Sequence, residues 1–188
     1  MTKYILHGGY TRIKNKFNEK FFKEILLGFK SSAKILLVLF ARKEKEWPML
    51  EKRERDHLTK SRQDLKLVFE IANKKIDILE RQIKYADVIY ILGGENEPLQ
   101  KQLRRVNYLK SLLKGKVVVG SSAGAYALSK YYYSVHNKGI FEGLGILPIK
   151  VLAHYTPRLG KKLEELKAHK ENLKTYALEE TKHIVLDE

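Results

Sequence analysis

Short hydrophobic runs alternate with longer amphipathic stretches along this chain. Four runs have the length of strands buried in a parallel sheet: residues 4–7, 34–40, 87–92 and 116–120. Three stretches repeat hydrophobic residues at helical spacing: residues 17–29, 76–83 and 97–113. This alternation predicts a three-layer α/β fold, with a mostly parallel sheet flanked by helices.

Weaker patterns fill the remaining chain. We expect short strands at 67–69, 131–135, 150–153, 174–178 and 183–186, and we place 131–135 at a sheet edge. Residues 141–145 are expected to form a loop, and Leu159, Leu163 and Leu166 mark a helix. The polar segment 42–64 is interpreted as a loop followed by a helix, because Pro48 disfavours helical backbone at Trp47.

Several chemically capable residues follow predicted strand ends. They are Gly8-Gly9, Gly93-Gly94, Ser122 and His154, which comes directly after Ala153. In open α/β sheets, binding sites lie at the carboxyl ends of the strands. We therefore expect these residues to meet at one edge of one sheet.

The sequence Gly120-Ser121-Ser122-Ala123-Gly124 follows three valines and precedes small, helix-compatible residues. This Gly-x-Ser-x-Gly pattern is typical of a nucleophile elbow, a sharp strand-to-helix turn that exposes a serine hydroxyl. The pattern therefore suggests Ser122 as a nucleophile. A strand, turn and helix without chemistry is the alternative that the five residues alone leave open.

A serine hydroxyl needs a base, and histidine is the usual one. His154 is the best placed, at a strand end downstream of the elbow. The other five histidines fit less well. His7 ends the first strand and could line the pocket, and His183 opens the last strand, far from the predicted carboxyl edge. His57 and His169 lie in charged helical stretches, and His136 lies in a polar segment.

An acid should hold the other nitrogen of the base. Glu180 ends a predicted strand downstream, and Glu142 lies between the serine and the histidine, so the residues alone leave both open. Glu179 would point the opposite way if the strand continues. The oxyanion hole needs backbone N–H donors, for which we expect Ala123 and the Gly93-Gly94 loop.

Composition narrows the classes of protein. The 188 residues suit one domain spanning 1–188, and an apolar fraction of 44% argues against disorder. There is no cysteine, no hydrophobic run of membrane-spanning length and no signal peptide at the N-terminus, so we expect a cytoplasmic protein without disulfides. The net charge of +15 comes from lysines and arginines interleaved with acidic residues, so we do not expect nucleic acid as the main partner.

Taken together, the motifs resemble those of the S51 serine peptidases, the family of α-aspartyl dipeptidase and cyanophycinase. The matching pieces lie in the family's order across roughly residues 86–188: 86–96, 120–125, 143–145, His154-Tyr155 and 178–180. The first half matches mainly through residues 6–9. The resemblance implies a flavodoxin-like, class I glutamine-amidotransferase-like fold and a Ser-His-Glu triad.

The resemblance, not the spacing, favours Glu180 over Glu142 as the acid beside Ser122 and His154. It also implies that Gly93-Gly94 supplies an oxyanion donor, and we assign Asn96 and Arg158 to substrate binding. A guanidinium such as that of Arg158 pairs well with a substrate carboxylate, and a surface salt bridge is its alternative role. The expected substrate is a short peptide, with no metal or cofactor and no membrane partner.

Some residues depart from the family's pattern. Asn137 lies near the position of a family aspartate, and Lys161-Lys162 replace a clear second arginine, so a preference for aspartyl substrates is not expected to follow. The sequence also ends early, at Glu188, which motivates the alternative of a catalytically silent member that binds a ligand or partner. Whether the chain is a monomer or a homodimer is left open.

Overall fold

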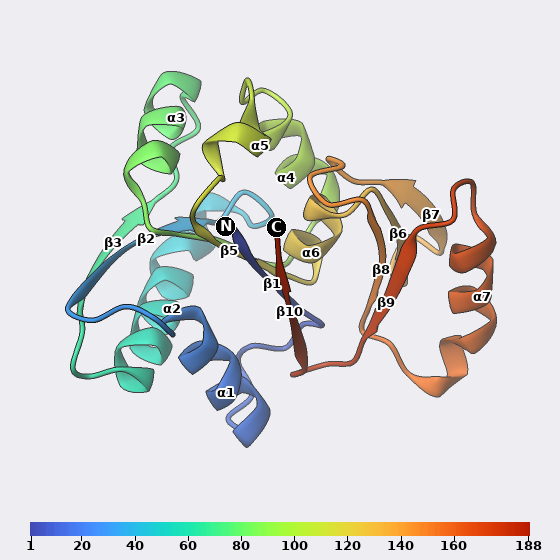
Figure 1. The fold of residues 1–188 in the computed structure, drawn as a ribbon, viewed down its shortest axis with the longest axis horizontal. Coiled ribbons are helices and arrows are strands. Elements are labelled where there is room, and N and C mark those ends of the chain that lie inside the picture. The colour runs from blue at the N-terminus through green and yellow to red at the C-terminus, as the bar shows by residue number, and fades with distance from the viewer.

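The computed structural model describes residues 1–188 and contains two β-sheets (Figure 1). The larger sheet has six strands in the order β10-β1-β5-β4-β2-β3, all parallel except β10. Its strands are β1 (Lys3–His7), β2 (Ser32–Val38), β3 (Lys66–Ile71), β4 (Val88–Ile91), β5 (Val117–Ser121) and β10 (His183–Asp187). The carboxyl ends of β1, β4 and β5 therefore lie side by side.

The smaller sheet has four strands in the order β7-β6-β8-β9. Its strands are β6 (Tyr131–Ser134), β7 (Gly139–Glu142), β8 (Ile149–Ala153) and β9 (Lys174–Leu178). Only β7 is antiparallel to its neighbour. Figure 1 shows this sheet beside α6 and α7, so that β8 and β9 end near the last residues of β1.

Helices cover both faces of the larger sheet, which confirms the predicted three-layer α/β fold. One face packs against α1 (Lys16–Ile25) and α2 (Trp47–Ser61). The other face packs against α3 (Ile76–Tyr85), α4 (Asn96–Leu103), α5 (Leu109–Leu112) and α6 (Ala123–Leu128). The smaller sheet carries α7 (Gly160–Ala168), and two short 3₁₀ helices span Glu44–Glu46 and Pro157–Leu159. No helix is long and apolar enough to cross a membrane.

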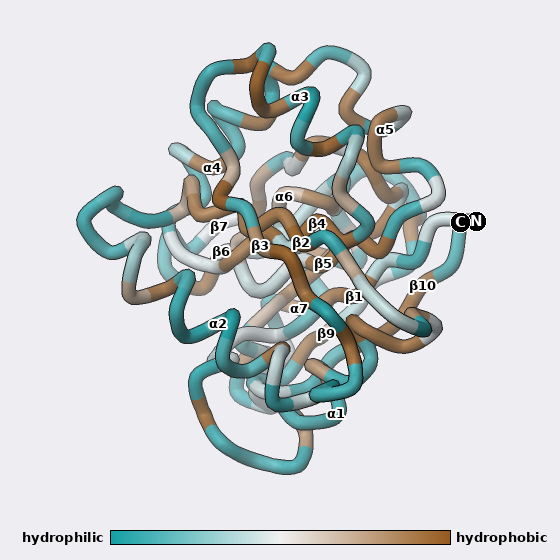
Figure 2. Tube along the Cα trace, turned by 90° about the vertical axis from the view of Figure 1, so that its left-hand side faces the viewer, coloured by the Kyte–Doolittle hydropathy of each residue, from teal (hydrophilic) through white to brown (hydrophobic).

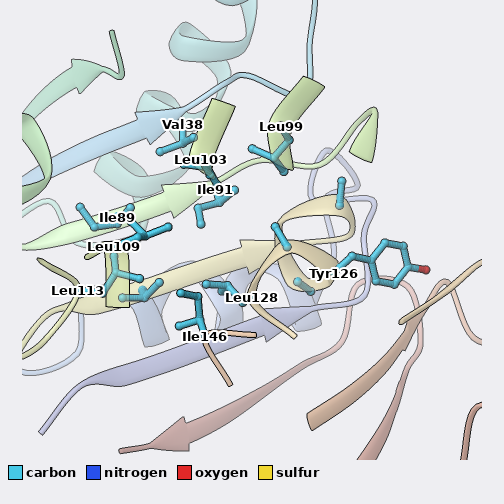
Figure 3. Packing of buried hydrophobic residues seen from close by; sticks show 14 of the residues in the cluster. Val38, Ile89, Ile91, Leu99, Leu103, Leu109, Leu113, Tyr126, Leu128 and Ile146 are labelled. Carbon is cyan, nitrogen blue, oxygen red and sulfur yellow. The ribbon is translucent and has the colours of Figure 1, made fainter. Parts of the chain in front are cut away.

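The alternation of side chains along each central strand fills both cores. On β4, Ile89 and Ile91 face the core beneath α3 to α6, whereas Val88 and Tyr90 face the core beneath α1 and α2. The hydrophobic segments run through the centre of the molecule in Figure 2, and Figure 3 shows Ile89 and Ile91 among the leucines of α4 and α5. Strands buried on both faces explain the continuous hydrophobic runs of the sequence.

Several helix boundaries differ from the prediction. The helix expected at 17–29 ends at Ile25, and Gly28 then takes a left-handed φ of 97°. The helix α2 begins at Trp47, because Pro48 falls in the first turn, where its missing N–H costs no hydrogen bond. The helix expected at 97–113 is two helices, interrupted by Tyr108 with a φ of 56°.

The strand arrangement also corrects three expectations. The strand at 131–134 is internal to the second sheet, between β7 and β8, and is not an edge strand. Phe141 and Glu142 belong to β7 and not to a loop. The strands that precede His154 and Glu180 belong to the smaller sheet, so the expected single edge of one sheet is wrong. The site residues meet where two sheets converge.

Candidate active site

Ser122 lies in a strained turn between β5 and α6. Its φ of 51° and ψ of −109° are unusual for a residue with a side chain, and such strain is concentrated at functional sites. The turn is tight: a Cβ on Gly120 would lie 2.7 Å from the carbonyl carbon of Gly124, and one on Gly124 would lie 2.2 Å from the carbonyl oxygen of Ile91. Both glycines are therefore required by the geometry of the elbow.

Three side chains form a hydrogen-bonded line at this turn. The hydroxyl Oγ of Ser122 lies 2.8 Å from Nε2 of His154. On the other side of the ring, Nδ1 of His154 lies 3.0 Å from Oε1 of Glu180. Because a carboxylate only accepts hydrogen bonds, Nδ1 carries the proton and Nε2 is free to accept from the hydroxyl. His154 follows β8, and Glu180 follows β9.

The rival acids are engaged elsewhere. Glu142 lies on β7 and accepts a hydrogen bond from Nζ of Lys170 at 2.7 Å. That hydrogen bond lowers the pKa of the Glu142 carboxyl. Glu179 pairs with Lys182, 2.7 Å away. Of the three glutamates considered, Glu180 is the one that contacts His154.

Ser122 lies next to the start of α6 and close to Gly93. Ala123 is the first residue of α6, so its N–H has no partner within the helix. Gly93 packs so closely that a Cβ there would lie 3.0 Å from Cβ of Ser122. Gly94 has a φ of +154°, and a Cβ there would lie 2.2 Å from the carbonyl oxygen of Ala41. The glycine loop therefore approaches the elbow as only glycine can.

Arg42 fixes the peptide bond of this glycine loop. Its Nε donates a hydrogen bond to the carbonyl oxygen of Gly93 at 2.7 Å. The carbonyl and N–H of a trans peptide point in opposite directions. The N–H of Gly94 therefore points away from Arg42, in a direction set by this hydrogen bond.

A cavity of about 520 Å³ opens beside Ser122 and His154. This volume suits a small ligand such as a short peptide. Its lining includes polar and charged side chains from several elements: Arg12, Arg42, Glu46, Arg53, Asn96 and His136. The lining therefore contains three guanidinium groups and one carboxylate, so positive charge predominates in it.

Arg53 is held at the cavity by a buried acid. Oε1 of Glu54 accepts a hydrogen bond from Nε of Arg53 at 2.8 Å, and Oε2 accepts one from the hydroxyl of Tyr90 at 3.2 Å. Glu54 is fully buried, and that burial raises the pKa of its carboxyl despite the nearby guanidinium. A buried charge needs such partners, so this contact restricts where the Arg53 side chain can lie.

The two residues assigned to substrate binding lie in different surroundings. Asn96, at the start of α4, lines the cavity, and its Oδ1 is buried without a hydrogen-bond partner. Arg158 is exposed on the short helix Pro157–Leu159, and it is not among the cavity-lining residues. Its role as a substrate ligand stays a prediction. Asn137 is exposed in the turn between β6 and β7.

Two histidines differ from their expected surroundings. His183 was expected far from the carboxyl edge, but β10 runs antiparallel to β1 and places it opposite His7 in register. His57 was expected to be solvated, but its ring packs on Phe22 with 4.7 Å between ring centroids. In each case, the neighbours come from strand pairing or packing that is distant in the sequence.

The motif-based prediction missed Arg12, Arg42, Arg53 and Tyr10 as cavity residues. Arg42 comes soon after the hydrophobic run at 34–40, so the rule that sites lie at carboxyl strand ends could have identified it. Arg53 gives no such signal, because it lies within a mixed-charge helix. The ring of Tyr10 meets that of His154 edge-on, with centroids 5.7 Å apart.

The model of peptidase family S51 matches residues 5–188 of this chain. The chain therefore belongs to peptidase family S51. Its fold is similar to that of a putative peptidase E protein from Listeria monocytogenes EGD-e, with 17% identity, a TM-score of 0.69, and coverage of 99% of this chain and 94% of that one. It is also similar to a peptidase from an acI-B1 Actinobacterium, with 17% identity, a TM-score of 0.70, and coverage of 98% and 83%. No curated protein matches the chain.

Proposed function

We propose that this protein is a serine peptidase that hydrolyses short peptides through Ser122, His154 and Glu180. The observation that carries the proposal is the line of two hydrogen bonds, 2.8 Å from Ser122 to His154 and 3.0 Å from His154 to Glu180. Membership of a peptidase family supports the same chemistry. A nucleophile, a base within reach and an acid that orients the base are the parts that nucleophilic acyl transfer requires.

In this mechanism, Oγ of Ser122 attacks the carbonyl carbon of the scissile peptide while Nε2 of His154 takes its proton. The imidazolium then gives that proton to the leaving amine, and an acyl-enzyme on Ser122 results. A water molecule, activated by the same imidazole, hydrolyses the ester and regenerates the serine. Glu180 holds the ring in the required tautomer and stabilises its positive charge.

The developing oxyanion needs donors that are already in place. We assign the N–H of Ala123 as one donor and an N–H of Gly93 or Gly94 as the second. The hydrogen bond from Arg42 to Gly93 supports this assignment, because it fixes the orientation of the glycine loop before substrate binds. Fixed donors need no reorganisation during the reaction.

The cavity indicates the kind of peptide that would bind. Its guanidinium groups favour a ligand with at least one carboxylate, such as a peptide with a free C-terminus. Asn96 lines the same cavity as these groups. We keep Asn96 as a substrate-binding residue on this ground.

A catalytically silent member of the family is the alternative. Such a protein would have no need to keep the acid beside the base, and an unpaired Glu180 would favour it. The 3.0 Å contact between Glu180 and His154 instead supports an active enzyme.

The test is a hydrolysis screen over dipeptides and tripeptides. Asp-X, Glu-X and neutral X-X peptides are compared with wild type and Ser122→Ala, and product amines are quantified by mass spectrometry. We expect turnover by wild type and none by the variant, with unchanged circular dichroism. Equal turnover by both proteins would reject Ser122 as the nucleophile, and no turnover of any peptide would favour the silent alternative.

A further inference from the structure

The turn that ends β1 contacts all three segments of the proposed triad. Three consecutive carbonyl oxygens of this turn each accept a backbone N–H: His7 O from Ser122 at 2.9 Å, Gly8 O from His154 at 3.1 Å, and Gly9 O from Thr181, the residue after Glu180, at 2.9 Å. Ser122, His154 and Thr181 all have left-handed φ values, between 51° and 64°. One short turn therefore holds three strained segments that are far apart in the sequence.

The turn packs closely against the segments that carry Glu180 and His154. A Cβ on Gly8 would lie 2.0 Å from the carbonyl oxygen of Glu179, and one on Gly9 would lie 2.3 Å from Cε1 of His154. Gly9 also has a φ of +112°. The positions of the Glu180 segment and of the His154 ring therefore depend on where this turn lies.

His7 holds this turn from inside the protein. The N–H of Gly9 donates to Nδ1 of His7 at 3.0 Å, so the ring proton is on Nε2, which donates to Oδ1 of Asn18 at 2.9 Å. The His7 ring is fully buried and packs on Phe21, with 4.3 Å between ring centroids. The ring orientation is therefore fixed on two edges and one face.

Asn18 extends this support along the loop. Its Nδ2 donates to the carbonyl oxygens of Tyr10 at 3.0 Å and of Ile13 at 2.6 Å. Asn18 lies in α1 and is itself buried, so its amide direction is set by these two carbonyls. An amide fixed in this way presents Oδ1 to His7 and thereby selects the tautomer that accepts from Gly9.

We propose that His7 is a positioning residue for the triad, which holds the Gly8-Gly9 turn through Nδ1 and so keeps Ser122 within hydrogen-bonding distance of His154. This inference rests on the function proposed above. Misplacement of a reacting group by about 1 Å can cost about 100-fold in rate, so a support that lies behind the site can control turnover.

The charge state of His7 suits this role. Burial lowers the pKa of His7 to about 4, although the hydrogen bond to Asn18 acts in the opposite direction. The ring therefore stays neutral where the enzyme would work, and it places no second positive charge beside the imidazolium that His154 forms during the reaction. His7 itself does not touch the substrate, because its ring is buried behind the turn.

Two substitutions separate the two nitrogen contacts of His7. In His7→Asn, the side-chain oxygen can lie near the place of Nδ1 and accept the N–H of Gly9. In His7→Gln, the amide nitrogen can lie near the place of Nε2 and donate to Asn18, but nothing accepts from Gly9. We expect kcat to fall about 10- to 100-fold in His7→Gln and less than about fivefold in His7→Asn, with KM changed less than about threefold in both.

His183→Gln is the matched control. His183 pairs with His7 across β1 and β10, and its partly buried ring packs on the same Phe21 ring, with 5.6 Å between centroids. Its side chain forms no hydrogen bond with the turn. We expect its kcat to match wild type. Rates are normalised to active sites titrated with a fluorophosphonate, so a loss of folded protein does not count as a loss of turnover.

The result that would overturn the inference is a folded His7→Gln with wild-type kcat. Equal kcat losses in His7→Gln and His183→Gln would also overturn it, because they would indicate a general effect on the strand pair. If His7→Gln does not fold, Asn18→Ser is measured in its place. We expect a severalfold loss of kcat at unchanged KM, and an unchanged kcat would reject the positioning role of His7.

Crystal structures provide a readout independent of activity. We expect the distance from Ser122 Oγ to His154 Nε2 to stay near 2.8 Å in His7→Asn and to lengthen in His7→Gln. An unchanged distance in His7→Gln would contradict the inference. Ser122→Ala separates this outcome from a failure of the proposed function: if it keeps wild-type turnover, the function is wrong, whatever the His7 variants do.

Discussion

Acid should destabilise this protein through His7. The buried ring has a pKa of about 4, lowered from 6.5 mainly by burial. Between pH 6.5 and 4, the unfolded chain therefore binds a proton at His7 that the folded protein excludes. The contribution of the neutral ring to the unfolding free energy is complete above pH 6.5 and is lost as the pH falls to 4. The difference corresponds to about 3 kcal/mol of unfolding free energy.

Urea unfolding at pH 7 and pH 4.5 measures this effect in wild type and His7→Gln. Glutamine does not titrate, so the variant lacks the pH-dependent contribution of His7 to the unfolding free energy. His57 and His183 also have pKa values lowered by burial, but they are present in both proteins, and their effects cancel in the comparison. We expect wild type to lose about 2–3 kcal/mol more than the variant between the two pH values.

Equal pH dependence in the two proteins would refute this reasoning. It would mean that His7 is protonated as easily in the folded protein as in the unfolded chain, so its ring would not be the neutral acceptor for Gly9. A larger loss of unfolding free energy in the variant than in wild type would lead to the same conclusion.

Four further predictions concern the site. Glu180→Gln should lower kcat about 10- to 100-fold in steady-state assays, less than for a fully buried acid, because its side chain is 44% exposed and water can partly replace it beside His154. Arg42→Lys should lower kcat about 10-fold or more in steady-state assays, because lysine cannot reproduce the Nε hydrogen bond to Gly93. Gly120→Ala should destabilise the fold by about 3 kcal/mol or more in thermal melts, since its Cβ would overlap the start of α6. Peptides with a free C-terminus should show a lower KM than their amides, and equal values would contradict the role of the guanidinium groups.

The central strands could be predicted from the sequence because their signal is local. Residues 88–92 and 117–119 are continuously hydrophobic and are followed by glycine, and both of these features are visible in a short window. Ser122 and His154 could be proposed for the same reason, since each follows such a run. The structure adds that they lie 2.8 Å apart, although 32 residues separate them.

The second sheet could not be predicted, because strand pairing is not local. The runs at 131–134 and 149–153 are short, and nothing in either indicates that they pair with each other and not with the first sheet. The choice between Glu142 and Glu180 was undecidable for a related reason. The direction of Glu180 depends on the left-handed turn at Thr181, whose N–H is held by Gly9 from the other end of the chain.

Covalent labelling decides whether Ser122 is the nucleophile. Wild type, Ser122→Ala and Ser121→Ala are treated with a fluorophosphonate, and the adduct is located by peptide fragmentation that distinguishes the two adjacent serines. We expect one adduct, on Ser122, in wild type and Ser121→Ala, and none in Ser122→Ala. An adduct on Ser121, or undiminished labelling of Ser122→Ala, would contradict this assignment.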